Sequence, residues 1–137
     1  MTDQPFHKWD RISTAVGGAT LTGFSKTIKG EMVDAPEAPR RKRGHLPYAH
    51  FITDSGRFGA TQYHGLRPEV LPSYQLCAGD LVRHDSDDSE PFILESVATV
   101  DHRVHLRWIG PDGLRVTLSN PAEAKMIRIR TARHARD

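Results

Sequence analysis

The chain has 137 residues, 37% of them hydrophobic and 26% charged, which is enough for one domain or for two very small ones. No apolar run approaches the roughly 18 residues that span a bilayer, and the first residues have neither the basic nor the apolar segment of a secretory signal. The single cysteine, Cys77, excludes an internal disulfide. These features predict a protein with no membrane partner in a reducing, cytoplasmic compartment.

The net charge of +2 conceals a segregation of charge along the chain. Residues 40–75 and residues 125–137 each carry a balance of +4, whereas residues 76–124 carry nine acidic and four basic side chains. A protein that binds nucleic acid without specificity usually spreads basic charge over its working face. We therefore expect only the two positive blocks to supply such a face.

The N-terminal residues allow two interpretations. Residues 5–16 form either a short helix, with Trp9, Ile12 and Val16 on one face, or an irregular arm anchored by Trp9. In the helical alternative Gly17-Gly18 ends the helix through a left-handed cap. Residues 19–33 follow, and their composition predicts one or two strands with a bend.

Residues 34–44 contain two prolines and four consecutive basic side chains, so they predict an exposed basic loop. Residues 46–52 and 57–64 then flank a Thr-Asp-Ser-Gly turn and predict a hairpin. If Thr53 pairs with Arg57, Ile52 lies opposite Phe58. Residues 65–75 predict a packed connecting loop.

The C-terminal half predicts five short strands, at residues 81–84, 92–100, 104–109, 114–119 and 125–130. The turn Gly110-Pro111-Asp112-Gly113 fixes a register in which Trp108 opposes Val116 and Leu106 opposes Leu118. One face of this hairpin is apolar and the other polar, as a half-buried antiparallel pair requires. Residues 120–124 fit a single helical turn before the last strand.

This pattern of five short strands, a Gly-Asp entry and a late helical turn resembles a small SH3-like barrel of the Tudor or KOW type. The resemblance covers about the last 55 residues. It implies a binding module more than an enzyme. No aromatic cage and no glycine-bearing KOW motif aligns with the chain, so no binding residue is carried over from those families.

The expected fold is therefore mainly β, with this small barrel in the C-terminal half, a β-hairpin region before it and either a short helix or an arm at the N-terminus. The expected organisation is a β-rich region at residues 1–75, a barrel at 76–131 and a basic tail at 132–137, as separate parts or as one compact domain.

The polar candidates are basic. The four consecutive basic residues of the predicted loop either contact phosphates electrostatically or form a solvated segment that keeps the protein soluble. Arg128 and Arg130 alternate with isoleucines on the last strand, which predicts that they point outward. The tentative nucleic-acid-binding residues are Arg40, Arg41, Lys42, Arg43, Arg128, Arg130, Arg133 and Arg136.

Other chemistry is weakly indicated. The spacing of the eight histidines does not bring three or four ligands together, so the sequence predicts no metal site. Cys77 with His84 is the only conceivable nucleophile–base pair, and nothing in the sequence orients the base. The acidic segment Asp85–Glu90 is a candidate contact for a basic protein partner. The sequence thus predicts no cofactor and no enzymatic activity.

The expected function is that of a non-enzymatic binding or adaptor protein that contacts nucleic acid or a nucleoprotein assembly. The mechanism is contact with the phosphate backbone and little base readout. The alternative is a protein-interaction or assembly subunit, such as a small structural component of a larger particle, with no nucleic-acid role.

Overall fold

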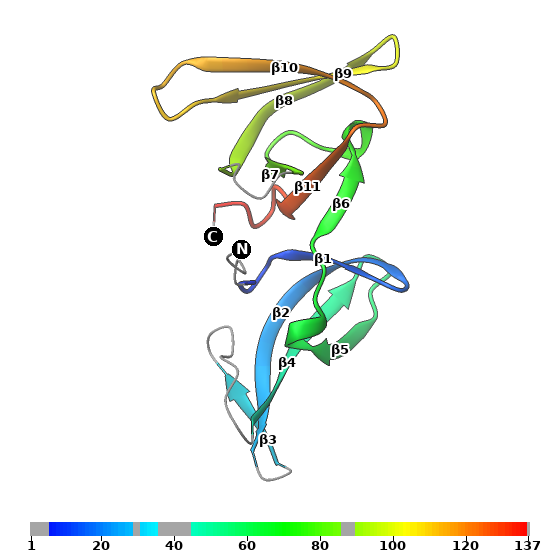
Figure 1. Ribbon diagram of the computed structural model, residues 1–137, viewed down its shortest axis with the longest axis vertical. Helices are drawn as coiled ribbons and strands as arrows, with labels where there is room; N and C mark the ends of the chain where they lie inside the picture. The colour runs from blue at the N-terminus through cyan, green and yellow to red at the C-terminus, as the bar shows by residue number, and fades with distance from the viewer. Residues whose placement is uncertain (1–5, 29–30, 36–44, 86–89, 137) are drawn as a thin grey trace. The chain divides into compact units, whose positions relative to one another are not determined.

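The computed structural model describes residues 6–28, 31–35, 45–85 and 90–136. This part of the chain is mainly β, as expected, and it divides into two compact units, Met1–Arg67 and Pro68–Asp137. Each unit contains one antiparallel sheet (Figure 1). No helix in the described ranges is long and apolar enough to cross a bilayer.

The first unit holds five strands: β1 (Arg11–Thr14), β2 (Gly17–Ile28), β3 (Glu31–Ala35), β4 (His45–Thr53) and β5 (Phe58–Gln62). Their order is β1-β2-β4-β5, and β3 pairs with β2 outside this path. The long strand β2 carries β1 and β3 one after the other along one side and β4 along the other. Its pairing with β4 shifts between Leu21 and Gly23, which is the bend expected in this segment.

The core of the first unit lies on one face of this sheet. Its buried members are Ile12, Ala19, Leu21, Phe24, Ala49 and Leu66. Tyr63 packs against them from a single 3-10 turn at Tyr63–Gly65, with its ring edge-on to Phe24 at 5.7 Å. The opposite face of β4 and β5 takes no part in this core.

The expectation of an N-terminal helix is wrong for the described residues. Arg11–Thr14 is a strand that forms a tight hairpin with the start of β2, in which Thr14 pairs with Gly17. The glycines interpreted as a helix cap instead begin β2 directly after the turn residues Ala15 and Val16, and Gly17 there has a φ of 112°. The Thr14 hydroxyl donates to the Gly17 carbonyl at 2.7 Å and closes this turn.

The β4–β5 hairpin has the predicted register. Ile52 pairs with Phe58, and Thr53 donates its backbone N–H to the Arg57 carbonyl at 2.8 Å. Gly56 has a φ of 88°, the left-handed conformation that this turn requires. Alternation and turn chemistry were therefore sufficient to predict this element.

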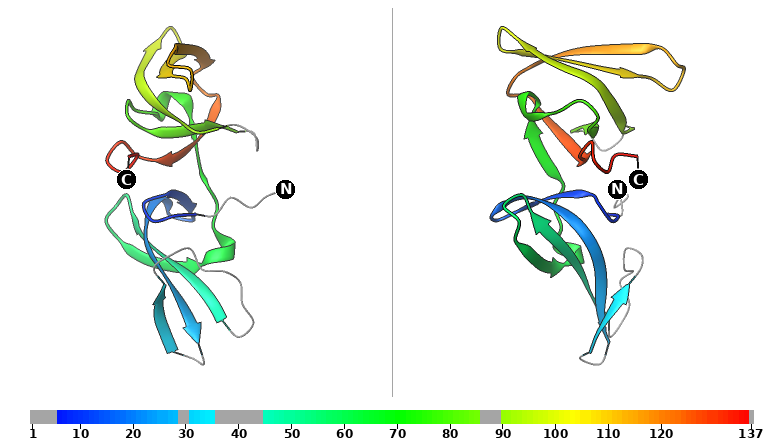
Figure 2. Two further views of the ribbon diagram at one scale, coloured as in Figure 1. Left: turned by 90° about the vertical axis from the view of Figure 1, so that its left-hand side faces the viewer. Right: turned by 180° about the vertical axis from the view of Figure 1, so that it is seen from behind.

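The second unit holds six strands: β6 (Glu69–Pro72), β7 (Leu81–His84), β8 (Phe92–Val100), β9 (Arg103–Ile109), β10 (Arg115–Pro121) and β11 (Lys125–Arg130). Their order is β10-β9-β8-β7-β11-β6. Strands β7 to β10 follow one another as a meander, and β11 returns to pair with β7. Figure 2 shows β8 curving between the β7–β11 pair and the β9–β10 hairpin.

The connecting loop expected at residues 65–75 is wrong, because it contains β6 between two 3-10 turns, Tyr63–Gly65 and Ser73–Gln75. Val70 and Leu71 pair with Ile127 and Met126 of β11. Proline is tolerated here because β6 is an edge strand and Pro72 is its last residue. The prolines alone had suggested a loop.

The β9–β10 hairpin also has the predicted register, with Trp108 opposite Val116 and Leu106 opposite Leu118. Gly110 donates its N–H to the Leu114 carbonyl at 2.8 Å. Gly113 has a φ of 82°, as the three-residue loop requires. Phe92 stacks on Trp108 with ring centroids 4.0 Å apart, which places this tryptophan in the core.

The helical turn expected at residues 120–124 is wrong. Strand β10 continues to Pro121, and Ala124 donates its N–H to the Pro121 carbonyl at 3.0 Å to form a tight turn. The reason is that Asn120 still pairs with Val104 of β9, which holds this segment in the sheet.

Candidate nucleic-acid interface

The predicted basic loop cannot be placed. Arg40, Arg41, Lys42 and Arg43 lie outside the described residues. Of the acidic segment Asp85–Glu90, the described part comprises Asp85 and Glu90, and both are exposed. The loop and the acidic segment therefore stay sequence predictions.

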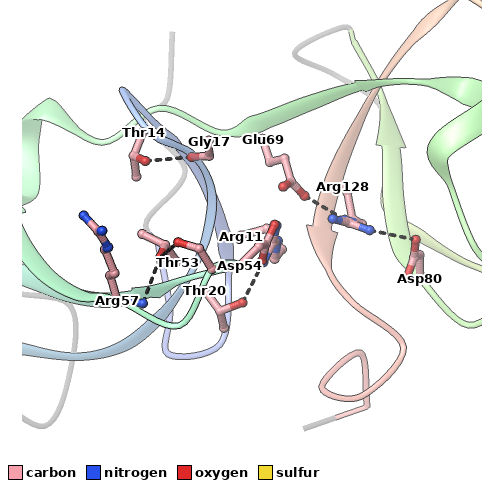
Figure 3. A network of polar contacts seen from close by, with 11 residues as sticks. Arg11, Thr14, Gly17, Thr20, Thr53, Asp54, Arg57, Glu69, Asp80 and Arg128 are labelled. Carbon is pink, nitrogen blue, oxygen red and sulfur yellow. Dashed lines mark hydrogen bonds and ion pairs between the residues drawn. The ribbon is translucent and has the colours of Figure 1, made fainter.

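The outward position predicted for Arg128 is wrong. Its Nε lies 2.7 Å from Oε1 of Glu69, and its Nη1 lies 3.6 Å from Oδ2 of Asp80 (Figure 3). The three side chains are only 14%, 5% and 2% exposed, respectively. Strand β11 lies between β6 and β7, so Arg128 contacts a buried carboxylate on each side and offsets one of their two negative charges.

Asp80 also organises the backbone around β11. Its Oδ2 accepts the N–H of Cys77 at 2.9 Å, and its Oδ1 accepts the N–H of Ala132 at 3.1 Å. The segment after β11 is therefore held against the start of β7. Ala135, in the predicted basic tail, is buried.

The remaining C-terminal arginines differ in exposure. Arg130 is half-buried, whereas Arg133 and Arg136 are exposed. Only the last two of the four predicted C-terminal arginines therefore present a largely open guanidinium.

The sequence prediction missed a basic surface on the outer side of the β9–β10 hairpin. Along β9 the buried residues Val104, Leu106 and Trp108 alternate with Arg103, His105, Arg107 and Ile109. The side chains of the second group thus lie on the side of the sheet opposite the core. We call this surface the β9 face; it comprises Glu95, Arg103, His105, Arg107, Ile109 and Arg115.

Two of the three arginines on the β9 face are held by neighbours. Arg103 donates from Nε to the Ser119 hydroxyl and from Nη2 to the Ser119 carbonyl, both at 2.9 Å. Arg115 pairs with Glu95 at 3.1 Å across β9, and both side chains are well exposed. The Arg103 bonds fix a guanidinium at the sheet edge, and its remaining N–H groups are still available to a ligand.

Arg107 lies between these two arginines. It is exposed, and its side chain forms no hydrogen bond or ion pair with any residue in the described ranges. Arg103 and Arg107 are four positions apart along the strand, which corresponds to about 13 Å. The β9 face therefore presents a row of cations, with Glu95 as its carboxylate.

The signal for this face was present in the sequence. The predicted hairpin register already placed Arg107 opposite Thr117 on the polar side. The net acidic count of residues 76–124 hid the surface, because most of the described carboxylates there lie in turns or, like Asp80, are buried. A charge count along the chain adds together residues that point to opposite faces of the sheet, so it does not reveal the charge of either face.

Other candidate chemistry has structural explanations. The Ser25 hydroxyl lies 2.6 Å from Nε2 of His50, but Ser25 is 1% exposed and thus closed to a substrate. Cys77 is exposed, and its Sγ lies 3.9 Å from the Gln75 carbonyl. No group of three or more metal-ligating side chains occurs within the described part of the chain.

The first unit also contains an open cavity of about 380 Å³ beside β1 and β5. Its lining includes the apolar residues Ile12, Phe51 and Leu66 together with Ser13, Thr14 and Thr61. All its lining residues are uncharged, so the cavity offers no group that would hold a charged substrate or a metal.

Comparison of the chain with protein-family models, with curated proteins and with solved structures gave no match. The arrangement of the described side chains therefore carries the functional argument.

Proposed function

We propose that this protein binds nucleic acid, free or in a nucleoprotein assembly, as a non-enzymatic binding or adaptor protein. The β9 face carries the proposal: Arg103, Arg107 and Arg115 line one surface of a rigid sheet, with Glu95 as its carboxylate. Guanidinium groups match phosphate oxygens in geometry and keep their charge at any physiological pH.

The distribution of carboxylates in the second unit supports this proposal. Glu69 and Asp80 are buried and both lie against Arg128, which offsets one of their two negative charges. Asp112 is engaged in the β9–β10 turn, where it accepts the N–H of Leu114 at 3.0 Å. The exposed arginines thus meet less opposition than the net charge of this region implies.

The strand order of the second unit supports the finer fold proposal of an SH3-like barrel. A meander of β7 to β10, with β11 returning to β7, is the arrangement expected for five barrel strands. Exposed Arg133 and Arg136 follow β11, and Arg40 to Arg43 precede β4 in the sequence. We assign these arginines and Lys42 additional phosphate contacts.

Fluorescence anisotropy of labelled single-stranded and duplex oligonucleotides, titrated across salt concentrations, tests the proposal. Removal of one phosphate-binding cation lowers the slope of log affinity against log salt by about 0.7 to 0.9. We expect Arg107→Gln to lower the slope by about one such unit. Arg57→Gln, at an exposed arginine of the first unit, is the control and leaves the slope unchanged.

A charge-gain variant sharpens this test. Glu95→Gln removes the carboxylate from the β9 face and releases Arg115, so we expect tighter binding and a steeper slope. Glu123→Gln changes the net charge equally at an exposed turn outside this face and is the matched control. The proposal is overturned if the wild-type protein binds no nucleic acid at low salt, or if the two glutamate variants behave alike.

One observation favours the alternative, a protein-interaction or assembly subunit. Ile109, Leu114 and Val116 are 56%, 67% and 38% exposed at the end of the β9–β10 hairpin. Ile109 and Val116 point to opposite sides of the hairpin, so a protein partner would contact the end of the hairpin and not one of its faces. Analytical ultracentrifugation tests this: association that Leu114→Ser abolishes supports it, and a monomer at all concentrations contradicts it.

A further inference from the structure

The outer face of the β4–β5 hairpin gathers rings and small side chains. The pairings of Tyr48 with Gln62, His50 with Ala60 and Ile52 with Phe58 put these six side chains on one side of the sheet. We call this surface the β4–β5 face. The core residues Ala49 and Phe51 lie on the other side.

The exposure of Phe58 has no structural explanation within the first unit. Phe58 is 82% exposed, whereas Ala49 and Phe51 of the same hairpin pack in the core on the other side of the sheet. On the core side of the sheet, Phe51 packs closely over Gly59: a Cβ placed on Gly59 would lie 2.5 Å from the Phe51 ring. The fold thus uses Phe51 and leaves Phe58 available for contact with a ligand.

The imidazole of His50 is fixed in place at the centre of this face. Its Nε2 lies 2.6 Å from the hydroxyl of Ser25, which is buried. Its two cross-strand neighbours are Gly23 and Ala60, which rise little above the sheet. The half-buried ring of His50 is therefore held by this hydrogen bond, and its neighbours on the sheet have small side chains.

The chemistry of the β4–β5 face matches a nucleobase. No Asp, Glu, Lys or Arg lies on this face of β4 and β5 between residues 47 and 62, and Tyr48, His50 and Gln62 supply hydrogen-bonding groups beside the ring of Phe58. Every base has a π face that stacks on aromatic side chains and polar edges that form hydrogen bonds.

We propose that the β4–β5 face binds unpaired bases of single-stranded nucleic acid, which stack on Phe58 and His50. This inference rests on the proposed function and specifies its ligand. Paired bases do not offer their π faces, so stacking here favours a single strand over a duplex. The β9 face has no Phe, Tyr or Trp side chain, so its arginines contact phosphates and give no such preference.

Three labelled probes test the inference by fluorescence anisotropy: a single-stranded oligonucleotide, the duplex of the same sequence, and a single strand of equal length without bases. Stacking is worth about 1–3 kcal/mol per base, so we expect Phe58→Ala to weaken single-strand binding about 5- to 150-fold. The salt slope, the duplex affinity and the affinity for the baseless strand stay unchanged.

Val16→Ala is the matched control, because Val16 is an apolar residue of the first unit that is 74% exposed. We expect it to leave all three affinities unchanged. An unaltered urea midpoint for both variants shows that the effect of Phe58→Ala is on binding and not on folding.

The outcomes separate the two proposals. If wild-type protein binds none of the probes, both are overturned. If it binds them, and Arg107→Gln lowers the salt slope while Phe58→Ala leaves single-strand affinity unchanged, only the present inference is overturned. It is also overturned if Phe58→Ala abolishes self-association in ultracentrifugation without altering single-strand affinity, because the face then joins copies of the chain.

Discussion

Each unit contains an arginine of low exposure that pairs with carboxylates. The two sites differ in whether those carboxylates are exposed or buried. In the first unit the Arg11 side chain is 3% exposed, and its partner Asp54 is 63% exposed; their oxygens and nitrogens pair at 2.7 and 2.8 Å. In the second unit it is the carboxylates that are buried, because Glu69 and Asp80 both lie against Arg128 (Figure 3). Removal of the arginine thus leaves a solvated anion in one unit and two buried anions in the other.

The outer faces of the two sheets differ in a related way. The β9 face of the second unit has a row of arginines and no Phe, Tyr or Trp side chain. The β4–β5 face of the first unit has aromatic rings and no charged side chain among its described residues. Under the proposed function, this contrast corresponds to separate roles, in which one sheet contacts phosphates and the other contacts bases.

The largest predicted effect concerns the two arginine sites. We expect Arg128→Met to lower the free energy of unfolding by about 3–5 kcal/mol, because it leaves buried carboxylates without a counter-charge. We expect Arg11→Met to cost about 1–3 kcal/mol, because Asp54 stays hydrated when the arginine is removed. Urea denaturation measures both, with Trp108 as the fluorescent reporter of the second unit and Trp9 of the first.

A double variant provides the control for this prediction. Adding Glu69→Gln to Arg128→Met removes one of the stranded charges, so we expect it to recover part of the stability. Equal effects at Arg11 and Arg128, or no recovery in the double variant, would contradict the contrast between the two sites.

The next effect concerns the turns of the two hairpins, which we expect to respond alike. Gly113 and Gly56 have φ values of 82° and 88°, and nothing lies within 4 Å of a Cβ added to either. Replacement by alanine therefore strains the backbone without a clash and costs about 1–2 kcal/mol in each unit. Urea denaturation is again the measurement.

Gly65→Ala is the control for the turn variants, because Gly65 has the same open surroundings without a positive φ. We expect a change of less than about 0.5 kcal/mol there. A turn variant as mild as this control would show that its hairpin tolerates a different turn.

The smallest effect is a pH dependence confined to the first unit. Burial of Tyr63 raises the pKa of its hydroxyl, and the nearby Asp10 carboxylate adds to this increase, whereas the N–H that Phe6 donates to the hydroxyl opposes it. The folded state therefore favours the protonated form more than the unfolded chain does. The resulting stability is present below the usual pKa near 10 and is lost as the pH rises through the folded pKa.

Urea midpoints measured at neutral and at strongly alkaline pH test this prediction. We expect Tyr63→Phe to reduce the alkaline loss of stability reported by Trp9. Tyr74→Phe, at a tyrosine of the second unit that is 47% exposed, is the control and leaves the profile unchanged. An identical profile for wild type and Tyr63→Phe would contradict the role of burial at this hydroxyl.

Local rules predicted the hairpins well and the irregular segments poorly. The registers Trp108–Val116 and Ile52–Phe58 were predictable, because side-chain alternation and a left-handed glycine each constrain the pairing independently. The same glycine rule failed at Gly17, where a helix cap and a hairpin turn demand similar residues. Strand β6 was missed because its pairing with β11 spans over 50 residues of sequence, beyond the reach of local patterns.

The sequence by itself determined the strands and registers of the β4–β5 and β9–β10 hairpins and the polar side of the β9–β10 hairpin, because these follow from a period of two and from turn geometry. Only the tertiary structure decided which polar residues stay in water. It buried Arg128 between two carboxylates that lie 59 and 48 positions away in the chain, and it left Arg107 and Phe58 exposed. Burial depends on which strands become neighbours, and that is set by packing across the whole sheet, which no local sequence pattern specifies.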